Sequence, residues 1–266
     1  MSETKPKIAL VLSSVRTPRV GPSAVNAVHD ALKKSPEYSK VDVTIIDVAS
    51  FNLPIFNEKV APAMVPTYAQ FEHEHSKKFS AAFQPYDGYI WVSPEYNGGV
   101  PGGAKNAIDY LYNEWIGKPI FIVAYGIHGG HSASLALRDI FEVMKLRVIP
   151  TRPLLKFSGD HHNGDLTPAM TQGVLGPDST KAWSESEEVV HGFEELLEFV
   201  NDKEKKGTRF LRDKLGLPWK LENMLELVQI VSIGASIRTY SWILFIYHLP
   251  IWDYFSNLPC YFWQWT

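Results

Sequence analysis

The sequence has only one cysteine, Cys260, so no disulfide can form within its 266 residues. This fits a reducing compartment, and we expect a cytoplasmic protein. An excess of basic residues is also missing, because 26 Lys and Arg are balanced by 29 Asp and Glu for a net charge of −3. Since nucleic-acid-binding domains normally carry a basic surface, we expect no nucleic-acid partner. The polar residues 1–7 lack the apolar core of a secretory leader, so none is expected.

Two common nucleotide-binding signatures, G-x-G-x-x-G and G-x-x-x-x-G-K-[ST], are absent from the sequence. What the sequence does contain is an alternation of apolar runs and amphipathic segments. The runs predict strands at residues 8–12, 41–48, 88–93, 119–125 and 147–150. The amphipathic segments predict helices at residues 24–32, 67–83, 104–111, 132–146 and 189–200. Residues 49–66 and 157–181 are rich in loop-forming residues, and we expect a long loop in each.

Such an alternation predicts an α/β fold with a doubly wound, five-stranded parallel sheet and helices on both faces. The length of each repeating unit favours the flavodoxin-like strand order 2-1-3-4-5. Ligands of such folds bind at the carboxyl ends of the strands, where strands one and three diverge. The loops after strands one, three and four are therefore expected to meet at one site.

The loop after strand one contains Ser13, Ser14, Arg16 and Arg19 just before a helix. Hydroxyls, backbone N–H groups and a helix N-terminus favour an anion, and an arginine can clamp a phosphate with two hydrogen bonds. Taken alone the pattern is weak, because a polar loop containing an arginine is usually only solvated.

The loop after strand three, Pro94-Glu95-Tyr96-Asn97-Gly98-Gly99, is the more informative one. A planar ring needs a wall of backbone, and glycine allows the backbone to approach closely. The alternative is a turn that needs a positive φ at Gly98 or Gly99. The loop after strand four contains Gly126, Gly129 and Gly130 and offers similar chemistry, with a plain turn again as the alternative.

No catalytic or metal-binding constellation stands out among the side chains. His128 and His131 are three residues apart, but no carboxylate or cysteine completes a metal site, so we expect none. We also expect no catalytic Ser-His-Asp or Cys-His arrangement.

Three motifs together resemble the NADPH-dependent FMN reductase family, which comprises flavodoxin-like quinone, azo-dye and flavin reductases. They are the Ser-x-Arg loop after strand one, Leu53-Pro54-Ile55-Phe56-Asn57-Glu58, and the Pro94–Gly98 block followed by Pro101-Gly102 and Lys105-Asn106-Ala107-Ile108-Asp109. The likeness covers residues 6–200. The sequence departs from the usual motif where Ser13-Ser14 replaces Gly-Ser and where Gly99 replaces a serine.

The resemblance implies bound FMN, NADPH or NADH as the hydride donor, and a quinone, azo compound or free flavin as the acceptor in a ping-pong reaction. It implies that the phosphate contacts Ser13, Ser14, Arg16 and Arg19. Pro94, Glu95, Tyr96, Asn97 and Gly98 would line the ring edge, and Gly126, Gly129 and Gly130 would close the other side. No catalytic side chain is implied, because the flavin supplies the chemistry. A homodimer is also implied. A flavodoxin-type electron carrier or FMN-sensing protein without turnover is the alternative function.

Residues 1–206 form the predicted reductase domain, and residues 207–266 a C-terminal extension outside the resemblance. Aromatic residues are far denser in this extension than the 13% of the whole chain. Residues 227–247 carry one charged residue, Arg238, and approach the length of a membrane span. Gln229, Arg238 and several hydroxyls argue against a membrane anchor. An extension packed on the domain or on a partner, or a stretch outside the folded protein, is favoured over membrane contact.

Overall fold

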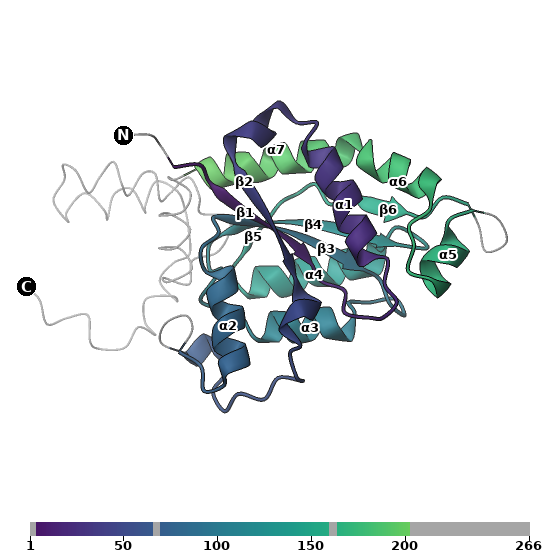
Figure 1. The fold of residues 1–266 in the computed structure, drawn as a ribbon. Helices are drawn as coiled ribbons and strands as arrows, with labels where there is room; N and C mark the ends of the chain where they lie inside the picture. The colour runs from purple at the N-terminus through teal and green to yellow at the C-terminus, as the bar shows by residue number, and fades with distance from the viewer. Residues whose placement is uncertain (1–3, 66–69, 160–163, 203–266) are drawn as a thin grey trace, which may run out of the picture. The chain divides into compact units, whose positions relative to one another are not determined.

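A parallel sheet forms the middle layer of the computed structural model, which describes residues 4–65, 70–159 and 164–202 (Figure 1). Its strand order is β2-β1-β3-β4-β5. A further strand, β6, also pairs with β4, nearer the carboxyl end of β4 than β5 does. The predicted flavodoxin-like order is therefore confirmed. The strands are β1 (Lys7–Leu12), β2 (Asp42–Asp47), β3 (Gly88–Pro94), β4 (Pro119–Gly126), β5 (Arg147–Val148) and β6 (Leu154–Lys156).

Helices cover both faces of the sheet, as predicted (Figure 1). On one face lie α1 (Gly21–Leu32), α6 (Pro177–Ser184) and α7 (Glu187–Asn201), whose apolar residues share one core cluster. On the other face lie α2 (Glu74–Phe83), α3 (Gly102–Asp109) and α4 (His131–Val143), which share the second cluster. The remaining helical elements are η1 (Pro36–Lys40), η2 (Val48–Phe51), η3 (Pro62–Met64) and α5 (Leu166–Thr171).

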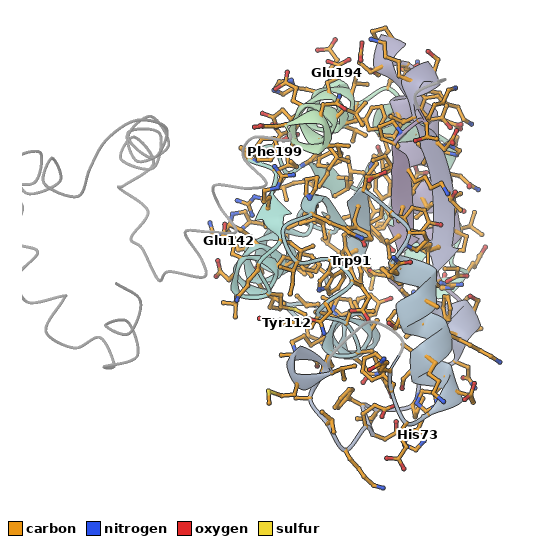
Figure 2. All side chains as sticks on the ribbon, turned by 90° about the vertical axis from the view of Figure 1, so that its left-hand side faces the viewer. His73, Trp91, Tyr112, Glu142, Glu194 and Phe199 are labelled. Carbon is orange, nitrogen blue, oxygen red and sulfur yellow. The ribbon has the colours of Figure 1, made fainter. Side chains whose placement is uncertain are left out.

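The central strands are buried on both faces, which explains their continuous apolar runs. In β1, Leu10 belongs to the first core cluster, whereas its neighbour Val11 belongs to the second. Trp91 of β3 lies in the interior (Figure 2) and packs edge-on against Trp115 and Phe141. Burial of these large side chains supplies most of the force that holds the layers together.

The prediction of one long loop over residues 157–181 was wrong. This region contains α5 and the start of α6, and Leu166, Ala169 and Leu175 are buried in the core. The predicted fifth strand was also incomplete, because β5 has 2 residues and β6 resumes the pairing with β4 further along the chain. Pro150 and Pro153 lie between the two strands and cannot donate ladder hydrogen bonds.

Two further expectations concern segments that the structure describes in part or not at all. The helix predicted over residues 67–83 begins at Glu74 in α2, and residues 66–69 are not described. The extension at residues 207–266 lies outside the described residues. Among the residues that the structure describes, no helix has both the length and the apolar character that crossing a membrane requires.

Candidate functional site

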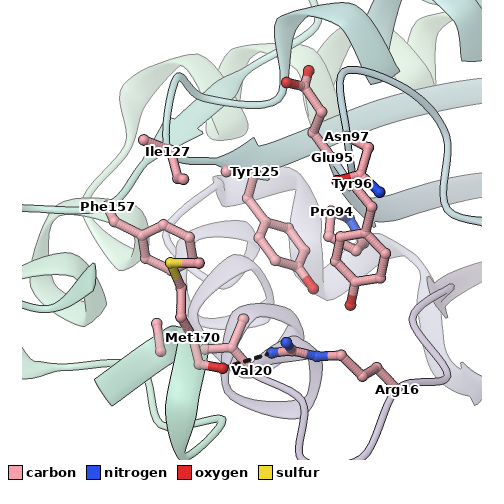
Figure 3. A pocket seen from close by; sticks show the side chains of 12 residues that line it. Arg16, Val20, Pro94, Glu95, Tyr96, Asn97, Tyr125, Ile127, Phe157 and Met170 are labelled. Carbon is pink, nitrogen blue, oxygen red and sulfur yellow. Dashed lines mark hydrogen bonds between the residues drawn. The ribbon is translucent and has the colours of Figure 1, made fainter. Parts of the chain in front are cut away.

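A cavity of about 360 Å³ opens at the carboxyl ends of β1, β3 and β4, where the sequence predicts the site (Figure 3). This volume lies within the usual range for small-molecule sites. The residues that line it are Arg16, Val20, Pro94, Glu95, Tyr96, Asn97, Tyr125, Gly126, Ile127, Phe157, Ala169 and Met170. Arg16 and Tyr96 lie at one side of the cavity and Phe157 and Met170 at the other, with Tyr125 between them (Figure 3).

The loop after β1 separates the roles of its two serines. Ser13 is fully buried, and its hydroxyl donates to the Val92 carbonyl at 2.8 Å, which ties β1 to β3. Ser14 is also fully buried, but its Oγ has no hydrogen-bond partner. An unpaired buried hydroxyl costs free energy, and Ser14 is therefore the less satisfied of the two serines.

The two arginines of the same loop also differ. Arg19 forms a bidentate ion pair with Asp47 at the end of β2, at 2.9 and 2.5 Å, and donates to the Ser14 carbonyl. The hydrogen bond to Asp47 raises the pKa of Arg19, so this guanidinium is held charged and fixed. Arg16 is exposed, donates to the Met170 carbonyl at 3.2 Å, and lies 5.8 Å from the Tyr96 ring centre. Of the two, only Arg16 lines the cavity.

A tight turn shapes the loop after β3. Tyr96 and Gly99 exchange two backbone hydrogen bonds of 3.1 Å, and the two residues between them, Asn97 and Gly98, have φ angles of 50° and 73°. Two left-handed residues in succession define a type I′ turn, which Asn-Gly favours. The turn thus requires the positive φ of Gly98 whether or not a ligand binds. A Cβ at Gly98 or Gly99 would meet no atom within 4 Å, so this turn faces open space.

The acidic residue of this loop is turned toward a helix. The Glu95 carboxylate accepts a 3.1 Å hydrogen bond from the Ala133 N–H in the first turn of α4. A carboxylate is favourable at this positive end of a helix. The Glu95 side chain therefore holds the loop, and its negative charge is compensated by α4.

Tyr125 at the end of β4 is 2% exposed, and burial raises its pKa far above the ordinary value. The Ser14 side chain lowers the pKa of Tyr125 and so offsets part of this rise, although the Ser14 Oγ has no hydrogen-bond partner. Tyr125 stays protonated at neutral pH and can donate a hydrogen bond into the cavity.

The glycines after β4 have separate positions. Gly126 lines the cavity, whereas Gly129 and Gly130 shape the turn before α4. A Cβ at Gly130 would come within 2.8 Å of the Tyr125 backbone nitrogen, and one at Gly129 within 2.9 Å of the Leu154 Cβ. Close packing and a positive φ of 79° at each account for these two glycines without a ligand.

The cavity thus brings together Arg16, Pro94, Glu95, Tyr96, Asn97 and Gly126 from the predicted set. The other predicted residues lie in the same loops outside its lining, namely Ser13, Ser14, Arg19, Gly98, Gly129 and Gly130. A cofactor contact stays a prediction for each residue of both groups.

Sequence reasoning missed Val20, Tyr125, Ile127, Phe157, Ala169 and Met170. Tyr125 and Ile127 flank a predicted site glycine and could have been included on that ground. Ala169 and Met170 carried no signal, because they lie in the region wrongly predicted to be a loop.

The loop at residues 53–58 does not line the cavity but is fastened to α3. The Asn106 amide accepts from Phe56 N at 2.9 Å and donates to the Pro54 carbonyl at 2.7 Å. Glu58 accepts from two backbone N–H groups just before α2. The two Asn106 bonds thus join the Leu53–Glu58 motif to the Lys105–Asp109 motif.

Comparisons with known proteins agree with the geometry. Residues 6–158 match the family model described as NADPH-dependent FMN reductase. An NAD(P)H-dependent FMN reductase of a Nectria species is 48% identical over 73% of this chain and 96% of its own length. An NAD(P)H-dependent FMN reductase of Schizosaccharomyces pombe is 35% identical over 73% of this chain and 91% of its own. A quinone reductase of Pseudomonas putida is 30% identical over 50% of this chain and 67% of its own.

Proposed function

The chain belongs to the NADPH-dependent FMN reductase family and is an FMN-dependent oxidoreductase that uses NAD(P)H, and we propose that it reduces a quinone, an azo compound or free flavin by a ping-pong mechanism. The quinone reductase among the relatives supports the first of these acceptors. When bound, FMN accepts a hydride at its ring and passes the electrons on.

The cavity at the carboxyl ends of β1, β3 and β4 is the observation that supports this function. The cavity and the loops around it fit FMN in three respects. The exposed Arg16 guanidinium borders the cavity, and the turn at Asn97 and Gly98 beside it faces open space. The Ser14 hydroxyl, which is buried in the loop after β1 outside the cavity lining, lacks a hydrogen-bond partner. Arg16 supplies a positive charge at the cavity while the Glu95 carboxylate is turned toward α4, and this supports an anionic ligand.

The chain's own groups would orient the flavin rather than react. Arg16 would exchange the neutral Met170 carbonyl for the phosphate, a stronger charge-assisted contact. Backbone groups of residues 94–97 would pair with the polar edge of the ring. Phe157 would exclude water from the side of the cavity opposite Arg16.

Stopped-flow spectroscopy of the flavin-loaded protein tests the enzyme function. NADPH should bleach the flavin absorbance without an acceptor, and adding a quinone should restore it. Bound flavin that NADPH does not bleach would instead identify an electron carrier or sensor. Protein that binds no FMN on reconstitution would exclude both functions.

Arg16→Ala tests the phosphate assignment. The substitution should weaken FMN binding by about 1.5–3 kcal/mol, the usual range for a hydrogen bond to a charged group. Arg138→Ala is the matched control, because Arg138 is an exposed arginine of α4 that pairs with Asp139 outside the cavity. Equal FMN affinity in both variants would remove Arg16 from the phosphate site.

We further propose a cytoplasmic homodimer. The loop between β2 and α2 supports association, because it exposes 87% of Ile55 and 73% of Met64 while Asn106 fixes its backbone. Apolar side chains on a fixed loop are typical of contact surfaces. Ile55→Asp should shift the mass measured by light scattering from dimer to monomer. An unchanged dimer would exclude this loop as the contact.

A further inference from the structure

One wall of the cavity comes from a part of the chain beyond the region that matches the family model. The match ends at residue 158, whereas Ala169 and Met170 belong to α5. The loops after β1, β3 and β4 thus form the part of the cavity that lies within the match, and α5 forms a further part. We refer to residues 164–176, which contain α5, as the cover segment.

The cover segment is firmly attached to the domain. Leu166 and Ala169 are buried, and the Asp165 carboxylate accepts from the Ser179 N–H at 2.6 Å. At the other end, Gly173 packs so tightly on the loop after β1 that a Cβ would come within 2.6 Å of Arg19 N. Such an attached segment can hold a side chain at a defined place beside the cavity.

Met170 is the side chain that the cover segment presents. It is 48% exposed, and its thioether lies beside Phe157, opposite Tyr96 (Figure 3). Its carbonyl holds Arg16 at 3.2 Å, so backbone and side chain have different tasks. A half-exposed methionine at the edge of a cavity can adapt to flat apolar ligands.

We propose that Met170 determines acceptor specificity by packing against the second ring of a bicyclic quinone. The inference rests on the proposed function. A second fused ring adds apolar surface that the Met170 side chain can contact, so Met170 would favour the larger acceptor. The contact requires no new chemistry, since the electrons still come from NAD(P)H.

Met170→Ala in the full chain tests this role, because it removes the thioether and leaves the backbone carbonyl in place. Specificity is measured as kcat/KM for 2-methyl-1,4-naphthoquinone divided by kcat/KM for 1,4-benzoquinone. This ratio should fall about fivefold to tenfold, the discrimination expected from one apolar contact. The dissociation constant of 1-naphthol, a bicyclic ring that does not oxidise the flavin, should rise about as much, while that of FMN stays within about twofold.

Val174→Ala is the matched control, because Val174 lies in the cover segment at 50% exposure but outside the cavity lining. An unchanged ratio and unchanged 1-naphthol binding in Met170→Ala, or equal changes in both variants, would overturn the inference. Each variant is also mixed with NADPH alone. If NADPH fails to bleach the flavin of the unsubstituted protein, the proposed function is refuted. If bleaching is normal but the ratio of kcat/KM values is unchanged in Met170→Ala, only the role of Met170 is refuted.

Discussion

Gly98→Ala separates the cost of the turn from the effect on a flavin. Gly98 has φ 73°, and an alanine there adopts the left-handed conformation at a cost of about 1–2 kcal/mol. Its Cβ would meet no atom within 4 Å, so no clash adds to that cost. The neighbouring Gly99 also faces open space but has no positive φ. Gly99→Ala should therefore leave stability unchanged or raise it slightly, because alanine restricts the unfolded chain.

Urea unfolding of the two apoproteins measures this difference without a contribution from bound ligand. Gly98→Ala should be the less stable variant by about 1–2 kcal/mol. FMN titration is then compared between them. If the ring lies against the turn, both variants bind FMN more weakly, although only one is destabilised. Equal stability of the two apoproteins would refute the conformational argument, and unchanged FMN affinity in both would place the ring elsewhere.

Substitutions at three other residues test further contacts of the domain. Asn106→Ala should lower the free energy of unfolding measured in urea by about 1–3 kcal/mol, because it removes both hydrogen bonds to the loop at residues 53–58, and an unchanged free energy would refute the role of these bonds. Arg19→Lys should lower the thermal midpoint, because lysine cannot form the bidentate pair with Asp47, and an unchanged midpoint would count against that pair. Burial, assisted by Lys33, lowers the pKa of His29, so the folded state favours the neutral ring and stability should fall as the pH drops below about 6.5. His29→Gln should flatten this pH dependence in urea midpoints measured from pH 7 to 5. A curve for the variant that runs parallel to that of the unsubstituted protein would contradict this role of His29.

The fold could be predicted because its strongest signals are local. Continuous apolar runs such as β4 occur only where both faces of a strand are covered, and this restricts the sheet to a parallel arrangement with helices on each side. The position of the site followed from topology, since the carboxyl ends of β1, β3 and β4 have to meet.

The C-terminal part of the site could not be predicted in this way. The segments that form α5 and α6 are 6 and 8 residues long, each contains a proline, and glycines lie on either side of α5, so no helical period is visible. Their stability comes from tertiary contacts, such as the Asp165 carboxylate with Ser179 N–H and the indole of Trp183 with the Lys156 carbonyl. Contacts between residues distant in sequence leave little trace in a single sequence.

The same distinction bears on where specificity arises within the cavity. Side chains in the recognisable motifs are largely engaged by the protein itself, since Glu95 bonds to α4, Asn106 holds a loop and Arg19 pairs with Asp47. Such side chains fix the backbone that a flavin would contact, and this task is the same for any acceptor. Discrimination between acceptors requires a side chain that is still free to contact them. Met170 meets this requirement, because it is half exposed at the cavity and only its carbonyl is bound to Arg16. Exchanging the cover segment between relatives should therefore change the acceptor preference more than exchanging the motif loops.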